Sequence, residues 1–254
     1  MKKTFAIPVT FLVILFCSCQ KEIAQEDALN AAYKLKVTFK HTVGDKAMQL
    51  GSTYQNPFNE TYTLTAFKYY ISNISLPQSE GSALTVPDVY HLVNEADDNS
   101  KSFILFLNKN QFNRIVFLIG VDSTRNVSGT QSGDLDPAKG MFWTWNSGYI
   151  MAKMEANSPA STAPANKVEI HVGGFKTGEN ALRTVTLDLA AGSIINIKEN
   201  GTSEIIIEAD ANKWFNAAHN MKIADFPVCT SPGTVALDYA DNYAKMFTVI
   251  SVNN

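Results

Sequence analysis

The chain has 254 residues, of which 45% are hydrophobic and 18% are charged, and its formal net charge is −3. This composition excludes an intrinsically disordered chain, and the sequence lacks the lysine- and arginine-rich block that nucleic-acid binding requires. Three cysteines, two of them only two residues apart, cannot form the disulfide framework of a small secreted scaffold, so we expect burial of apolar side chains to stabilise the fold.

The N-terminus has the pattern of a bacterial lipoprotein signal. Lys2 and Lys3 precede an uncharged run over 5–16, which is too short to span a bilayer. The run ends in Phe-Cys-Ser-Cys, which resembles a lipobox with Cys19 as the acylated residue. We therefore predict a signal peptide over 1–18, a polar tether over 19–31 and a lipid anchor on Cys19 that holds the protein at a bacterial membrane, most simply the outer membrane. An ordinary cleaved signal is the alternative.

The rest of the chain reads as short strands. From residue 33 to His41 apolar and polar residues alternate, which is typical of a half-buried strand. Similar segments follow at 62–70, 89–93, 103–107, 115–121, 149–154, 168–172, 185–189, 194–197, 205–209 and 247–252. Short helices are predicted within 210–219 and 238–246. The pattern predicts an all-β protein, with a single antiparallel β-sandwich-like domain over 32–254 and long loops.

Several phrases resemble, in order, the MbnP-like family of copper-binding proteins. They are VTFKHTVG at 37–44, FKYYISNISL at 67–76, YHLV at 90–93, MFWTWNSGY at 141–149, IHVG at 170–173 and DNYAKMF at 241–247. The resemblance implies a periplasmic or secreted β-domain, in which some relatives bind copper through histidine and a kynurenine derived from tryptophan. It also implies a diheme partner, similar to cytochrome c peroxidase, that is associated with the tryptophan oxidation.

The four histidines are the candidate metal ligands, because imidazole suits copper. His41 and His91 share strand faces with apolar residues, whereas His171 lies opposite Ile170 and its apolar neighbours and is expected to face solvent. His219 follows a tryptophan at helical range. His41 and His171 match the family phrases best and are the leading candidate ligands. His91 and His219 rank below them. The alternative for each is a core or rim histidine that is hydrogen-bonded to backbone or carboxylate.

The three tryptophans are the candidates for oxidation. Trp143 and Trp145 share one face of a predicted strand, and Trp214 lies five residues before His219. Packing is the alternative, because aromatic residues at strand spacing usually belong to a core. Cys229 is a soft potential copper ligand only as a thiolate, so we expect a buried, inert thiol.

The signal pattern predicts a lipid-anchored, extracytoplasmic protein, and the family resemblance implies that it binds or handles copper. No GxSxG, HExxH or Walker-type glycine motif is present, so we expect no enzymatic activity. The alternative function is a metal-free surface lipoprotein that binds a protein or glycan partner through loops and exposed aromatic side chains.

Overall fold

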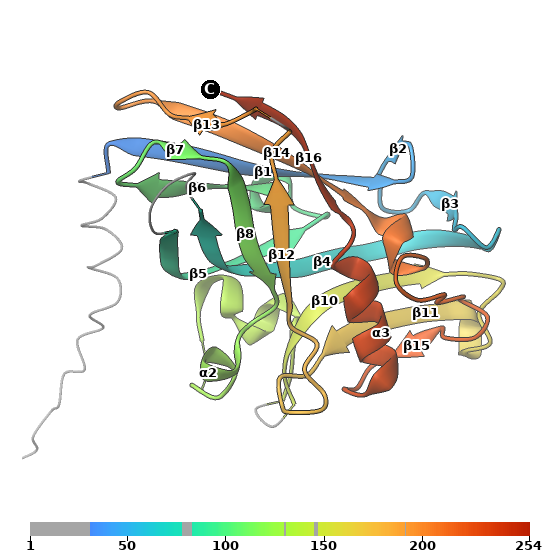
Figure 1. The fold of residues 1–254 in the computed structure, drawn as a ribbon. Helices are drawn as coiled ribbons and strands as arrows, with labels where there is room; N and C mark the ends of the chain where they lie inside the picture. Colours follow the sequence, from blue (N-terminus) through green and yellow to red (C-terminus); the bar gives the residue numbers. More distant parts are fainter. Residues whose placement is uncertain (1–30, 78–82, 130, 145–146, 191) are drawn as a thin grey trace, which may run out of the picture. The chain divides into compact units, whose positions relative to one another are not determined.

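The structure, a computed structural model, describes residues 31–77, 83–129, 131–144, 147–190 and 192–254. Residues 32–254 form one compact unit, whose fold is all-β as expected (Figure 1). The predicted signal peptide, the predicted tether up to residue 30 with Cys19, and Trp145 lie outside the described residues. Among the residues that are described, no helix is both long and apolar enough to cross a bilayer.

Two sheets build the unit. The first contains β16 (Phe247–Asn253), β14 (Thr202–Asp210), β1 (Tyr33–Val43), β2 (Lys46–Ala47) and β6 (Ser102–Leu107). The second contains β12 (Arg183–Asp188), β8 (Arg114–Ile119), β4 (Thr61–Leu76), β10 (Gly148–Asn157), β11 (Lys167–Gly173), β15 (Val228–Cys229), β3 (Thr53–Gln55), β5 (Leu84–Asn94) and β9 (Phe142–Thr144). A small separate ladder joins β7 (Gln111–Phe112) and β13 (Ile195–Asn196).

Most strand pairs are antiparallel, as predicted, but two are parallel. β1 pairs with β14 and β11 pairs with β15 in the parallel sense, and the other pairings between described strands are antiparallel. Strand β8 lies between β12 and β4 inside the second sheet. Its residues Ile115, Phe117 and Ile119 are buried, whereas Val116 and Leu118 on the other face are partly exposed.

The helices are short. Within the described residues they are α2 (Ser123–Asn126), α3 (Thr234–Tyr243) and the 3₁₀ turns η1 (Asp98–Lys101), η2 (Gly133–Leu135), η3 (Pro137–Lys139), η4 (Pro164–Asn166) and η5 (Ala211–Trp214). The helix expected within 210–219 is reduced to the single turn η5. The helix expected at 238–246 begins four residues earlier, after Gly233, and ends at Tyr243.

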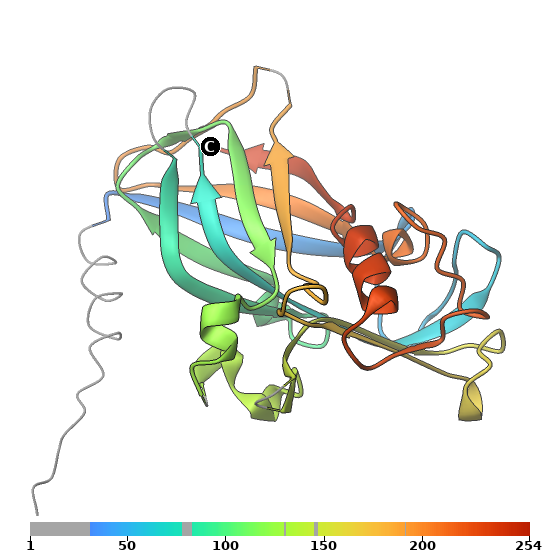
Figure 2. The same cartoon turned by 60° about the horizontal axis from the view of Figure 1, so that its bottom comes forward.

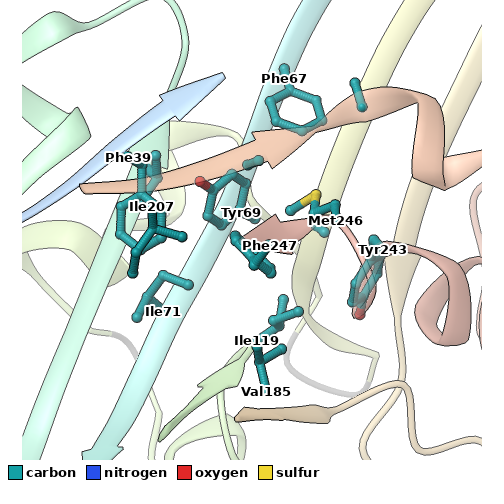
Figure 3. Packing of buried hydrophobic residues seen from close by; sticks show 14 of the residues in the cluster. Phe39, Phe67, Tyr69, Ile71, Ile119, Val185, Ile207, Tyr243, Met246 and Phe247 are labelled. Atoms are coloured by element: carbon teal, nitrogen blue, oxygen red, sulfur yellow. The ribbon is translucent and has the colours of Figure 1, made fainter. Parts of the chain in front are cut away.

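The main core fills the space between the two sheets. Phe39 of β1 meets Tyr69 of β4 and Phe247 of β16 edge-on, with ring centroids 5.8 and 6.0 Å apart (Figure 3). Each buried aromatic side chain removes a large apolar area from water, and edge-to-face pairs add to that stabilisation. Helix α3 contributes buried Tyr239 and Tyr243 to the same cluster.

A second, smaller core lies on the outer face of the second sheet. Its buried residues are Tyr70, Leu92, Val121, Leu135, Met141, Tyr149, Ile150 and Met151. The segment that carries α2, η2 and η3 covers them on the side of β4 and β10 that faces away from β1 (Figure 2). Tyr149 donates a hydrogen bond to the carbonyl of Leu135 at 2.7 Å, which fixes this segment to the sheet. The long connection after β8 is therefore a structured cover.

Candidate metal centre

His41 lies in the main core and is hydrogen-bonded at both ring nitrogens. Nδ1 is 2.7 Å from Oε2 of Glu95, and Nε2 is 2.9 Å from the hydroxyl oxygen of Tyr69. Burial lowers the pKa of His41 and raises the pKa of Tyr69 well above its usual range. The neutral imidazole therefore donates from Nδ1 to Glu95, and its Nε2 lone pair accepts the proton of the Tyr69 hydroxyl.

Glu95 carries this network to the surface. Burial by itself raises the pKa of Glu95, but the hydrogen bond from His41 and the ion pair with Lys101 lower it below its usual value. Lys101 lies 3.1 Å from Glu95 and 2.7 Å from Asp98. A metal ion at His41 would have to displace the fully buried Tyr69 hydroxyl. We therefore interpret His41 as a core histidine in this conformation.

His91 faces an acceptor at each ring nitrogen. Nε2 donates to the carbonyl oxygen of Ser100 at 2.7 Å, and Nδ1 lies 3.1 Å from Oδ2 of Asp134. The ring also packs on Phe103, with centroids 4.4 Å apart. Burial by itself raises the pKa of Asp134, but the hydrogen bonds from His91 and Lys139 hold it well below its usual range. His91 thus fastens η2 and η1 to β5.

His171 projects from the outer face of β11. Its Nε2 lies 2.8 Å from Oε1 of Glu155 on the adjacent strand β10, and its side chain is 16% exposed. Because a carboxylate accepts, Nε2 carries the proton and Nδ1 carries the lone pair. Nδ1 of His171 has no hydrogen-bond partner among the described residues. This is the state in which an imidazole binds a metal.

Burial and charge keep His171 neutral. Burial first, and then the nearby Lys153, lower the pKa of His171. Burial by itself raises the pKa of Glu155, but the hydrogen bond from His171 and the charge of Lys153 lower it. At neutral pH the pair is therefore an imidazole held by a carboxylate. The lone pair on Nδ1 is available at a partly exposed position.

His219 is the most exposed of the four, with 41% of its side chain accessible. Its Nε2 lies 3.3 Å from Oδ2 of Asp241 and 3.7 Å from Oδ1 of Asp238, both on α3. Asp241 also binds Arg183 at 2.6 Å, and the main-chain nitrogen of His219 donates to Asn242 at 2.8 Å. These contacts fix the loop before α3 and leave the ring at the surface.

Two of the three candidate tryptophans are described. Trp214 is fully buried, donates to the sulfur of Met246 at 3.3 Å and packs on Phe67 and Tyr243. Trp143 is partly buried and lies against Gly173, since a Cβ at Gly173 would be 2.5 Å from its Cζ3. Positions two apart on a strand share a face, so the Trp143 ring lies on the same face of β11 as His171.

The structure gives each histidine its own carboxylate. The partners are Glu95, Asp134, Glu155 and Asp241. No group of three or more His, Cys, Asp or Glu side chains within the described residues is placed to hold a metal ion. The sequence allowed a carboxylate partner as the alternative for each histidine, but it did not identify these four acids. No periodicity signals them, because each pairing depends on strand register or loop placement.

Cys229 is buried on β15, as expected, and burial raises its pKa to about 11. It is therefore a neutral thiol at physiological pH and a poor metal ligand, because thiolates are the metal-binding form.

Comparison with known proteins identifies one family and one fold relative. The MbnP family model matches residues 32–231. Among solved structures, "MbnP from Methylosinus trichosporium" is similar, with 13% sequence identity and a TM-score of 0.56 over 87% of this chain and 98% of that chain. At this identity the likeness shows the fold alone. A search of curated proteins finds no match.

Proposed function

The chain belongs to the MbnP family, and on that premise we propose that it is a non-enzymatic, extracytoplasmic protein that binds or handles copper. The family match over 32–231 supports the link to copper and the location outside the cytoplasm. The structural observation that supports a specific copper ligand is the His171–Glu155 pair. It presents an imidazole whose second nitrogen has no partner within the described residues.

His171 is the proposed primary copper ligand. Histidines that bind metals commonly donate their other ring N–H to a carboxylate, which fixes the tautomer and the ring orientation. Glu155 has that relation to Nε2 of His171, at 2.8 Å. The other histidines support this ranking. His41 and His91 have both nitrogens in contact with protein groups, and His219 stands exposed beside two aspartates.

One imidazole does not hold copper alone, and Trp143 is the proposed source of a second donor. Its ring lies against Gly173, two residues beyond His171 on the same strand face. Conversion of tryptophan to kynurenine is a four-electron oxidation that breaks the indole C2–C3 bond, takes up oxygen atoms from water or dioxygen and releases C2 as formate; it exposes an aromatic amine, which is a nitrogen donor. That oxidation needs an external oxidant, and the proposed supplier is a diheme partner similar to cytochrome c peroxidase. Trp214 is a poorer candidate for oxidation because it is fully buried in the core.

The proposed anchor is a lipid on Cys19. The support is the sequence pattern alone, since this residue lies outside the described part of the chain. Fractionation of cells that express the full chain tests it. The wild type should sediment with membranes and incorporate labelled palmitate, and Cys19→Ser should do neither. Equal membrane association of the two proteins would overturn the anchor.

Copper stoichiometry tests the main proposal. Tag-free mature protein that has been co-expressed with the partner is loaded with copper(I) under anaerobic conditions, desalted and analysed for metal. We expect near-stoichiometric copper in the wild type and in His219→Ala, and a large loss in His171→Ala. Peptide mass spectrometry after co-expression with the partner should find kynurenine in place of Trp143. Negligible copper in the wild type would contradict the proposal.

A second function is favoured by the four histidine–carboxylate pairs. Because each histidine already has a protein partner, all four satisfy a purely structural role. In that case the protein is a metal-free surface lipoprotein that binds a protein or glycan. Exposed Ile104 and Phe106 on strand β6 then form part of the contact surface. Negligible copper in the experiment above would support this alternative.

A further inference from the structure

Basic side chains form a row across the outer face of the second sheet. Lys68 on β4 lies directly opposite Lys153 on β10, and Lys153 lies directly opposite His171 on β11. Like charges that face each other across two strands destabilise a sheet. The chain as a whole has a formal net charge of −3, so the row is a local exception to its overall acidity.

The ends of the two lysines converge on one turn. Nζ of Lys68 donates to the carbonyl oxygen of Lys139 at 3.2 Å, and Nζ of Lys153 donates to the carbonyl oxygen of Gly140 at 2.8 Å. These carbonyls belong to consecutive residues, so the two ammonium groups are held near each other. Burial first, and then the charge of Lys153, lower the pKa of Lys68.

The carboxylates near this turn contact Lys139 and Lys153 directly, but within the described residues none of them forms an ion pair with Lys68. Lys139 pairs with Asp134 at 2.5 Å, and Lys153 approaches Glu155 at 3.5 Å. Glu155 is shared with His171. Asp136, the other acid of the turn, accepts from the main-chain N–H of Ala138 at 2.8 Å, and Glu155 acts on Lys68 through its charge without an ion-pair contact.

We propose that Lys68 and Lys153, with Lys139 at the rim, bind an oxyanion, either the carboxylate or the phosphate group of a small ligand. Each ammonium group has three N–H donors; Lys68 and Lys153 each give one to a carbonyl of the turn and Lys139 gives one to Asp134, so donors remain for the ligand. The side chain of Lys153 is 13% exposed and that of Lys139 is 42% exposed, so the site is partly desolvated on one side and open on the other. Charge-assisted hydrogen bonds are strongest in such surroundings. This site does not depend on copper binding.

Anion titration of the metal-free mature chain tests this proposal. Inorganic phosphate and acetate are added in separate series at constant ionic strength, with chloride as the balancing anion. Binding is followed by ¹H–¹⁵N shifts of the Gly140 and Lys153 amides and by the thermal midpoint. Lys68→Met and Lys153→Met are compared with Lys40→Met, which removes an exposed lysine from β1 on the other sheet.

We expect saturable shifts at Gly140 and Lys153 with at least one of the two anions. Loss of one ammonium donor should weaken that affinity about tenfold or more in Lys68→Met and Lys153→Met, with no change in Lys40→Met. The anion that binds more tightly identifies the ligand class. If Lys68 has a purely structural role, Lys68→Met should lower the thermal midpoint by the same amount with and without anion. That result, or an absence of saturable shifts in the wild type, would overturn the proposal.

Discussion

Oε1 of Glu155 lies 2.8 Å from Nε2 of His171, across the antiparallel pair β10 and β11. The two residues are diagonal rather than directly opposite, since Glu155 faces Glu169 and His171 faces Lys153 in the ladder. This contact determines which nitrogen of His171 carries the proton. It is the basis for ranking His171 first among the candidate ligands.

The first prediction concerns Glu155 as a positioning residue for His171. Replacing Glu155 by Gln keeps the shape of the side chain but removes the charge that holds the Nε2–H tautomer. We expect copper(I) affinity to fall about 10- to 100-fold, as measured by competition with a chromophoric chelator. Glu169→Gln is the matched control, because Glu169 is on the same face of β11 and pairs with Lys167, and it acts on His171 through its charge without the hydrogen bond that Glu155 makes. Equal affinities in the two variants would show that Glu155 has no such role.

The second prediction concerns acid and His41. Burial lowers the folded-state pKa of His41 below its ordinary 6.5, so the unfolded chain takes up a proton first. The free energy of unfolding should therefore decrease as pH falls from about 6.5 toward the folded-state pKa. The pKa of Glu95 is below its ordinary 4.5, so a further loss should begin near that pH as the unfolded chain protonates.

Urea unfolding between about pH 7 and pH 5 measures the contribution of His41. His41→Gln should be less stable at neutral pH and should lose less stability on acidification than the wild type. Glu95→Gln should cost about 1–3 kcal/mol at neutral pH, because the buried imidazole loses a charged acceptor. His219→Gln is the exposed control. An unchanged pH slope in His41→Gln would contradict the neutral, buried state assigned to this ring.

The third prediction concerns the contact between Trp143 and Gly173. Gly173→Ala places a methyl group 2.5 Å from Cζ3 of Trp143, so the ring must move. We expect a loss of about 1–3 kcal/mol in stability and a change in tryptophan emission. In a Trp143→Ala background the same methyl group should cost less, which a double-mutant cycle measures. Additive costs would show that the ring and Gly173 are not in contact.

The fourth prediction concerns the thiol of Cys229. With Cys19 replaced by serine and the signal removed, Cys229 is the remaining cysteine of the mature chain. Its burial and its pKa of about 11 predict labelling by a disulfide reagent at least about 100-fold slower in the native protein than in urea. Native labelling as fast as in urea would mean that β15 does not cover it.

Alternation predicted much of the fold because it reports which face of a strand is buried. The alternation correctly predicted the buried face of β1 from residue 33 to His41. It also correctly placed His171 on the strand face opposite buried Ile170. The resemblance carried by the ordered phrases is confirmed by the family match. The helix near 210–219 was overestimated because Asp210 caps a single turn, after which the chain changes direction at an isolated bridge between Asn216 and Asn220.

The hydrogen-bond partners of the histidines could not be predicted from the sequence. His91 shares a face with Val93, yet its partner Asp134 comes from a turn about forty residues later in the chain. The parallel pairing of β1 with β14 joins segments that no local pattern connects. Strand faces follow from local periodicity, but strand register and loop placement arise from packing of the whole domain.

Long-range ¹H–¹⁵N spectra of the imidazole nitrogens, recorded before and after one equivalent of copper(I), test the central assignment most directly. We expect Nδ1 of His171 to shift strongly, its Nε2 to keep its proton, and the signals of His41 and His91 to stay in place. Strong shifts at His41 or His91 with His171 unchanged, or no shift at any histidine, would contradict it.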